Sequence, residues 1–185
     1  NKARVVVIGG GVVGVSTLYH LAKKGWDDVV LVERRELTSG STWHAAGLLP
    51  LFNMSYSVGQ IHKYSVNLYQ KLEEETGQTV GLRQVSNIRL ACTADRMDEY
   101  RFYAGVAKTI GVDVRYLTPD DVKQIWPLCN TDGLIGAIRH PDDGYIQPAD
   151  LTQALAIGAR NMGAEIYRNT TVTAIKATTD GDWCI

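Results

Sequence analysis

A glycine-rich turn near the start of the chain restricts the fold more than any other sequence feature. The segment "RVVVIGGGVVG" places Gly9, Gly11 and Gly14 in the spacing G-x-G-x-x-G, directly after a short run of β-branched residues. A helix is predicted next, because "VVGVSTLYHLAKKG" has apolar residues at helical spacing and Gly25 as a terminator. In such a unit the first glycine makes the tight turn, the second lets a pyrophosphate approach the backbone, and the third lets the helix pack closely.

An acidic residue ends the next predicted strand. The run "VVLVE" predicts a second buried strand, so the two strands and the helix make a βαβ unit with a right-handed crossover. Glu33 lies 19 residues beyond Gly14. It can accept hydrogen bonds from both hydroxyls of an adenosine ribose, and its charge would repel a 2′-phosphate. The pattern predicts a dinucleotide site that disfavours NADP; the alternative is a glycine-rich turn with Glu33 merely exposed.

The chain after Glu33 does not return at once to a crossover helix, as it does in a simple NAD-binding domain. Residues 34–50 sustain neither a helical nor a strand period. Ser41 and Thr42 can hydrogen-bond a diphosphate. The small residues that leave space for a flat ring are Ala45, Ala46 and Gly47. We expect this segment to lie along an extended ligand.

A histidine stands beside a tryptophan in this segment. An ordinary loop histidine donates to a backbone carbonyl, and this is one interpretation of His44. However, His44 follows the nucleotide turn at a distance that suits the far end of a dinucleotide, and Trp43 can shield it from water. A neutral imidazole nitrogen can add as a nucleophile to the 8α-methyl position of a flavin. The other histidines are expected to have structural roles: His20, His62 and His140.

Further elements are predicted along the chain. Helices are expected over residues 61–77, 94–111, 118–127 and 147–163, and strands over residues 87–92, 134–138, 165–167 and 172–177. In the third of these helices, Thr118 is the expected N-cap, with Asp121 closing a capping box. The chain stops inside a further apparent strand, so we expect it to be the N-terminal piece of a longer protein.

Composition limits the kinds of partner. The formal net charge of the 185 residues is −1, which gives no electrostatic reason to expect nucleic acid or an anionic membrane. No apolar run approaches the roughly 18 residues that a membrane-spanning helix requires. The three cysteines match no metal-ligand spacing, so no metal is expected: Cys92, Cys129 and Cys184.

Four segments carry a resemblance to a known family. "ELTSGSTWHAAGLL", "KLEEETGQTVG", "RLACTADRMDEY" and "HPDDGYIQPADLTQALAIGAR" resemble the dimethylglycine and sarcosine dehydrogenases, flavoproteins of the D-amino-acid oxidase/glycine oxidase class. The likeness runs over essentially the whole chain, and S-T-W-H-A-A-G is its most specific part. It implies that His44 carries FAD covalently through the 8α-methyl group. The other FAD contacts it implies are Val12, Val13, Glu33, Arg34, Gly40, Ser41, Thr42, Trp43, Ala45, Ala46, Gly47, Leu48 and Val172, whose backbone would lie near adenine.

The resemblance also implies a fold and a reaction. The fold is α/β: a Rossmann-type FAD-binding domain from residues 1–83 and 144–185, incomplete in this chain, with residues 84–143 beginning an antiparallel substrate domain. The reaction is oxidative N-demethylation of dimethylglycine or sarcosine, in which a hydride passes from the N-methyl carbon to flavin N5 and the iminium yields formaldehyde or methylene-tetrahydrofolate. Electrons then pass to an electron-transfer flavoprotein or to oxygen.

Three further implications follow from the same resemblance. Larger members carry a folate-binding C-terminal region, which makes tetrahydrofolate a second candidate cofactor. The catalytic residues and most substrate contacts are expected beyond Ile185, so the sequence does not choose between dimethylglycine and sarcosine. The expected compartment is the cytoplasm in a bacterium and the mitochondrial matrix in a eukaryote.

Two other functions stay open at this stage. The first is an NAD-linked dehydrogenase, against which the segment from Ser41 to Gly47 argues. The second is a non-catalytic regulatory protein of the same fold. Relatives of that kind resemble this chain but lack the attachment histidine, so His44 favours an enzyme.

Overall fold

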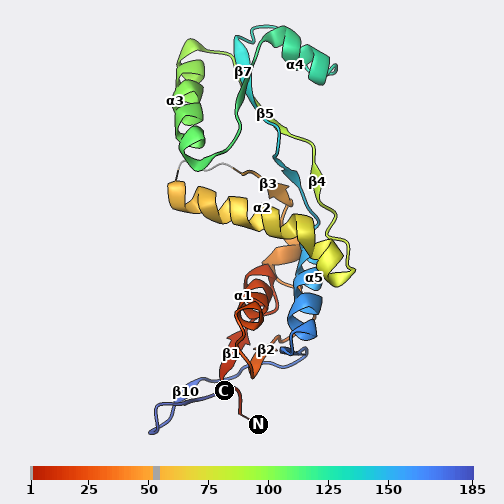
Figure 1. Cartoon of the computed structure of the whole chain (residues 1–185), viewed down its shortest axis with the longest axis vertical. Coiled ribbons are helices and arrows are strands. Elements are labelled where there is room, and N and C mark those ends of the chain that lie inside the picture. Colours follow the sequence, from red (N-terminus) through yellow and green to blue (C-terminus); the bar gives the residue numbers. More distant parts are fainter. Residues whose placement is uncertain (1, 52–54) are drawn as a thin grey trace. The chain divides into compact units, whose positions relative to one another are not determined.

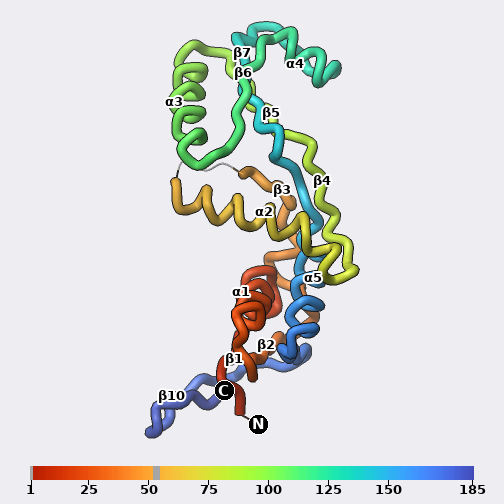
Figure 2. Tube along the Cα trace, in the orientation of Figure 1, coloured from red at the N-terminus to blue at the C-terminus, as the bar shows by residue number. Residues whose placement is uncertain are grey.

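The computed structural model describes residues 2–51 and 55–185, and the chain divides into two compact units. The first unit comprises residues 1–47, 71–81 and 147–185, and the second comprises residues 48–70 and 82–146. Figure 2 shows the amino-terminal segment, in red, running together with the carboxy-terminal segment, in blue, within the first unit. Residues 48–70, which the sequence grouped with residues 1–83, cluster instead with the second unit.

A parallel sheet forms the base of the first unit. Its strands are β1 (Val5–Ile8), β2 (Val29–Val32) and β9 (Glu165–Tyr167), in the order β1-β2-β9. Helix α1 (Val12–Lys23) connects the parallel neighbours β1 and β2, so the predicted βαβ unit is confirmed. Strand β9 pairs with the other edge of β2, also in parallel.

Helix α5 (Pro148–Asn161) packs beside α1, as Figure 1 shows. The contact is close because Gly158 has no side chain: a Cβ added there would lie 2.8 Å from Cε2 of Tyr19. The Tyr19 ring is fully buried, and its hydroxyl donates to Glu75 at 2.7 Å and accepts from Lys23 at 2.8 Å. Glu75 belongs to α2 (Tyr56–Thr76), which ends before the predicted terminator Gly77. Gly158 therefore packs against the edge of the Tyr19 ring, and Glu75 and Lys23 hold its hydroxyl.

The second unit contains two antiparallel sheets. One has the order β5-β7-β6, from β5 (Asn87–Ala91), β7 (Gly136–His140) and β6 (Arg115–Leu117). The other has the order β3-β8-β4, from β3 (Leu48–Leu49), β8 (Gly144–Tyr145) and β4 (Arg83–Gln84). Strand β3 pairs with β8, and the residues after Gly47 belong to this unit.

Two helices of the second unit begin and end as predicted. Helix α3 (Ala94–Ile110) is followed by Gly111 in the left-handed region, at φ 77°. Helix α4 (Pro119–Ile125) begins after Thr118, whose hydroxyl accepts from the N–H of Asp121 while the Asp121 carboxylate accepts from the N–H of Thr118. The Thr118 hydroxyl and the Thr118 N–H, which both donate to the Asp121 carboxylate, hold the pKa of this exposed carboxyl below its usual value. The predicted capping box is confirmed.

The main departure from prediction lies near the carboxyl end. Of residues 172–177 only Lys176–Ala177 form a strand, β10, which pairs with β11 (Trp183–Cys184). Val172 lies outside it, so the longer predicted strand is wrong. Within the two described ranges, no helix combines the length and apolar character needed to cross a membrane.

Two matched glycine-to-alanine changes test the packing of α5. Alanine favours a helix interior over glycine by about 0.5–1 kcal/mol. In Gly105→Ala the full-length protein should gain thermal stability, because within the described residues no atom lies within 4 Å of the added methyl group. In Gly158→Ala the methyl group meets the held Tyr19 ring, and overpacking costs about 1–3 kcal/mol. Calorimetry should show a lower unfolding midpoint for Gly158→Ala; equal gains for both variants would contradict this packing.

Candidate functional site

The turn between β1 and α1 has no room for a side chain at its last glycine. A Cβ added at Gly14 would lie 2.0 Å from the carbonyl oxygen of Gly9, so the first turn of α1 packs directly on the end of β1. Gly9 itself has φ 113°, a conformation that side chains oppose. The N–H of Gly9 donates to the carbonyl of Val32 at 2.9 Å and joins the turn to β2. The amino end of α1, with its positive dipole, is thus held at the edge of the sheet.

The middle residue of the turn is also required to be glycine. A Cβ added at Gly10 would lie 2.6 Å from Cδ2 of Leu37 and 2.9 Å from Cβ of Glu33. The motif treats this position as variable, so both Gly10 and Leu37, which is 5% exposed, were missed from the sequence. The unbroken run of three glycines was the available signal.

Two backbone groups hold the carboxylate of Glu33. Its Oε2 accepts from the N–H of Gly10 at 2.6 Å, and its Oε1 accepts from the N–H of Arg35 at 2.8 Å. A carboxylate oxygen has more than one acceptor direction, so both oxygens can still accept from a ligand hydroxyl. The N–H of Gly10 is used by Glu33 and does not serve a phosphate.

The carboxyl ends of β2 and β9 lie side by side. Beyond β2, the carbonyl of Glu33 accepts from the N–H of Thr170 at 2.8 Å, and Glu36 forms an ion pair with Arg168. Val172, which is half-buried, follows two residues after Thr170. This edge is where open α/β sheets bind ligands. The structure therefore brings the chain segment of Val172 to the same edge as Glu33, while Arg34 is exposed beside it.

The loop after β2 contains a short turn that the sequence did not predict. Residues Ser41–His44 form one turn of 3₁₀ helix, η1, which packs against α5. Thr42 is 8% exposed, and its Oγ1 accepts from the N–H of Val12 at 2.9 Å. A Cβ added at Gly11 would lie 3.0 Å from that oxygen, so this glycine leaves room for the threonine. The loop is thereby attached to the amino end of α1.

The other side chains of the loop face solvent. Val13, at the start of α1, is exposed, and Gly47 is half-buried. The exposed residues of the loop are Gly40, Ser41, Trp43, His44, Ala45 and Ala46. Two of the apolar ones are strongly exposed, Val13 at 78% and Trp43 at 62%. Leu48, at 71%, begins β3 in the second unit. Val13 and Trp43 have water contact that a bound ring system would remove.

The imidazole of His44 has a defined tautomer. Its Nδ1 lies 3.1 Å from the carbonyl oxygen of Gly40. A carbonyl can only accept, so Nδ1 carries a hydrogen, and in the neutral imidazole the lone pair is then on Nε2. The Trp43 ring lies beside it, with centroids 4.3 Å apart and planes tilted by 45°. His44 therefore makes the hydrogen bond to a backbone carbonyl that an ordinary loop histidine makes. In the neutral ring this bond leaves Nε2 as the nucleophilic nitrogen.

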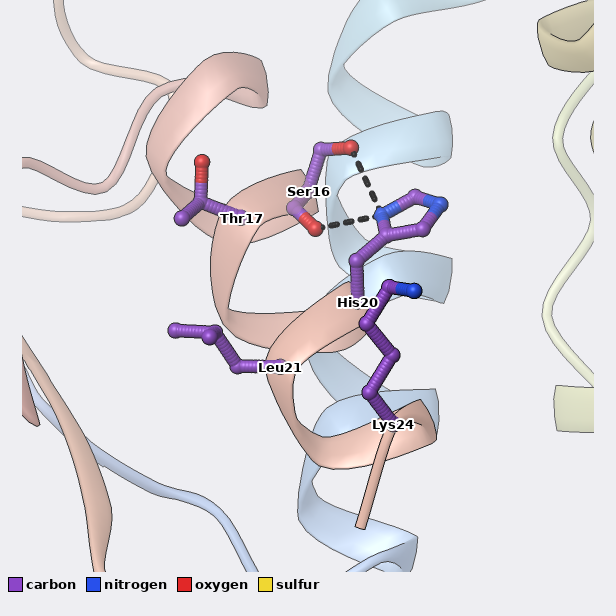
Figure 3. A pocket seen from close by; sticks show the side chains of 5 residues that line it. All are labelled: Ser16, Thr17, His20, Leu21 and Lys24. Carbon is purple, nitrogen blue, oxygen red and sulfur yellow. Dashed lines mark hydrogen bonds between the residues drawn. The ribbon is translucent and has the colours of Figure 1, made fainter. Parts of the chain in front are cut away.

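The remaining histidines do not join this site. His20 lies on α1, where its Nδ1 is 2.7 Å from the carbonyl oxygen and 3.3 Å from the hydroxyl of Ser16, at a shallow hollow lined by one helix alone (Figure 3). His140 is 1% exposed in the second unit, where its ring meets Tyr103 edge-on, and burial lowers its pKa to about 4. Among the described side chains, no group of three or more His, Cys, Asp or Glu could hold a metal ion.

Comparison with known proteins gives concordant matches. The family model described as FAD dependent oxidoreductase matches residues 4–185. The mitochondrial dimethylglycine dehydrogenase of Homo sapiens is 46% identical over 183 residues, which cover 99% of this chain and 21% of that protein. The mitochondrial sarcosine dehydrogenase of Homo sapiens is 41% identical over 181 residues, covering 97% and 20%. The chain thus spans about a fifth of the length of these relatives.

A solved structure is similar over nearly all of the chain. The crystal structure of L-proline dehydrogenase from P. horikoshii has a TM-score of 0.90 at 29% identity. The match covers 97% of this chain and 47% of that one. The expected α/β class with parallel and antiparallel sheets is confirmed.

Replacing Gly14 by alanine should disrupt the turn. The methyl group would overlap the carbonyl oxygen of Gly9, so α1 must move away from β1 and carry its N–H groups with it. We expect FAD affinity of the full-length protein to fall by more than about tenfold, which is 1.4 kcal/mol. Gly105→Ala is the control, because its added methyl group meets no described atom within 4 Å. Equal flavin content in both purified variants would show that the close approach at Gly14 is not needed for binding.

Proposed function

The chain belongs to the FAD dependent oxidoreductase family, and from this premise we propose that its first unit holds FAD along the edge formed by the β1–α1 turn, Glu33 and the loop from Gly40 to Gly47. The observation that carries the proposal is the turn itself. Gly14 packs on Gly9 and Glu33 is held by two backbone N–H groups, so helix dipole and ribose acceptor share one edge of the sheet. The second unit would begin the substrate domain.

Each part of the cofactor has suitable residues. The diphosphate would bind at the amino end of α1 and to Ser41 and Thr42; the Thr42 oxygen accepts from Val12, which leaves its own hydrogen to donate. The ribose would bind Glu33. The remaining proposed contacts are Gly9, Gly11, Val12, Val13, Gly14, Arg34, Gly40, Trp43, Ala45, Ala46, Gly47, Leu48 and Val172.

His44 is the proposed point of covalent attachment. Its Nε2 would bond to the 8α-methyl carbon, while the Nδ1 bond to Gly40 holds the ring. Attachment would release one hydrogen from the methyl carbon and the Nδ1 hydrogen of the imidazole, and dioxygen would take up both with two electrons to give hydrogen peroxide. The neutral tautomer favours this reaction because a protonated imidazole has no lone pair to donate. In this role His44 anchors the flavin and does not receive the hydride.

The proposed reaction is oxidative N-demethylation of a small N-methyl amino acid such as dimethylglycine or sarcosine. FAD would supply the hydride acceptor, the iminium would take up water to give formaldehyde and the demethylated amino acid, and the electrons would leave to an electron-transfer flavoprotein or to oxygen. Tetrahydrofolate would accept the one-carbon unit in a further domain. We assign the protein to the mitochondrial matrix in a eukaryote and to the cytoplasm in a bacterium. A regulatory protein that binds FAD without turnover is the second candidate.

The choice of nucleotide is tested at Glu33. Glu33→Ala should weaken FAD binding by about 1.5–3 kcal/mol, because charge-assisted hydrogen bonds of that size are lost. The matched control is Glu36→Ala, since Glu36 is exposed and pairs with Arg168 instead of the turn. Titration calorimetry on the full-length protein should show loss of affinity in the first variant alone. Tight NADPH binding by a wild-type protein without a flavin spectrum would refute the assignment.

Covalent attachment is tested at His44. Acid precipitation of the full-length protein should leave the yellow colour in the pellet, and a proteolytic peptide containing His44 should carry the mass of FAD. His44→Ala should lose the acid-stable flavin and keep dissociable flavin, whereas His20→Ala should keep the bond because His20 lies on α1. Oxidation of dimethylglycine or sarcosine should fall in His44→Ala without vanishing. Quantitative release of flavin by acid from the wild type would contradict attachment, and covalent flavin with no turnover of any N-methyl amine would favour the regulatory candidate.

A further inference from the structure

We propose that Thr42 is a positioning residue for covalent attachment: its hydrogen bond to the helix α1 backbone holds the turn that carries His44 in register with the dinucleotide site. The inference rests on the proposed function of His44. It concerns a contact within this chain, the 2.9 Å bond from the Val12 N–H to Thr42 Oγ1, which joins residues 30 positions apart. In attachment Thr42 acts through His44, and this role is separate from its proposed contact with the diphosphate.

The buried side chain of Thr42 attaches the loop to helix α1. Among its exposed neighbours Ser41, Trp43 and His44, it is the buried side chain, at 8% exposure. The Val12 N–H opens α1, so it lacks a partner within its own helix. Thr42 gives this part-buried N–H an acceptor within the protein. Thr42 thus satisfies the helix end that the cofactor needs and fixes the loop by the same bond.

The link from Thr42 to His44 is short and stiff. Both belong to η1, and the turn is closed by a bond from the Ala45 N–H to the Thr42 carbonyl at 3.2 Å. The His44 ring is bonded back to Gly40, so its orientation follows that of the turn. A displacement of Thr42 is therefore passed to the imidazole.

The ends of the loop add little restraint of their own. Gly40 precedes the turn and Gly47 follows it, the latter at φ 73°, and glycine permits many backbone conformations. A turn flanked by glycines can pivot unless a contact in its middle holds it. Thr42 supplies that contact, together with the packing of η1 on α5.

Attachment is expected to be sensitive to this restraint. Bond formation requires reacting atoms held at about 3–3.5 Å, and a misplacement of about 1 Å can cost a factor of 10² in rate. Non-covalent binding of FAD draws on many contacts and should depend less on any one of them. Loss of the Thr42 bond should therefore slow attachment much more than it reduces binding.

The test compares Thr42→Val with Thr42→Ser in the full-length protein. Valine keeps the branched shape and removes the acceptor, while serine keeps the acceptor. Apo-protein is mixed with FAD, and at intervals total bound flavin and acid-stable flavin are measured separately. We expect Thr42→Val to attach flavin at least about tenfold more slowly than wild type with most non-covalent binding retained, and Thr42→Ser to stay within about threefold.

Two further variants keep the test decisive. If Thr42→Val does not fold, Thr42→Ala replaces it, because its smaller side chain lets a water molecule accept from Val12. Thr17→Val is the matched control, since the Thr17 hydroxyl is exposed and donates to the carbonyl of Val13. It should attach flavin at the wild-type rate.

The outcomes separate the two proposals. A normal attachment rate in Thr42→Val, or a loss of attachment that only follows the loss of total binding, would overturn the role of Thr42 and leave that of His44 intact. A wild-type protein that binds FAD and never forms acid-stable flavin would overturn the proposed attachment itself.

Discussion

The close approach of α1 to the end of β1 is the constraint on which the rest of the site depends. A Cβ at Gly14 would lie 2.0 Å from the Gly9 carbonyl oxygen, so the helix can sit there only without that atom. This position brings the N–H of Gly10 to Glu33 and the N–H of Val12 to Thr42. The Glu33 carboxylate, the amino end of α1 and the loop that carries His44 are therefore all held by one turn.

Much of the fold could be predicted because local physical signals agree with tertiary packing. The β-branched runs of β1 and β2, the glycines around α1, and the Thr118 capping box each specify an element from neighbouring residues. Strands of two or three residues, such as β3 and β8, have no period to detect and exist through their partners. The place of β9 beside β2 likewise follows from α5 packing on α1, which no local pattern contains.

The residues of the candidate site also differ in whether local sequence or the folded backbone determines their role. Gly9, Gly11, Gly14 and Glu33 were predicted from spacing, because the turn imposes fixed offsets along the chain. Gly10 was missed, since its need for glycine comes from Leu37 and from Glu33 across the turn. For Thr42 the sequence indicated a diphosphate contact, whereas its bond to Val12 could be found only from the folded backbone. The tautomer of His44 likewise depends on where the Gly40 carbonyl points.

We propose that this turn and loop together present Nε2 of His44 to a flavin bound along the sheet edge. The most direct test is a crystal structure of the full-length protein with its natural cofactor. We expect continuous electron density from Nε2 of His44 to the 8α carbon, with the diphosphate at the amino end of α1 and the ribose on Glu33. Density that places the flavin away from His44, or joins it to another residue, would contradict the claim.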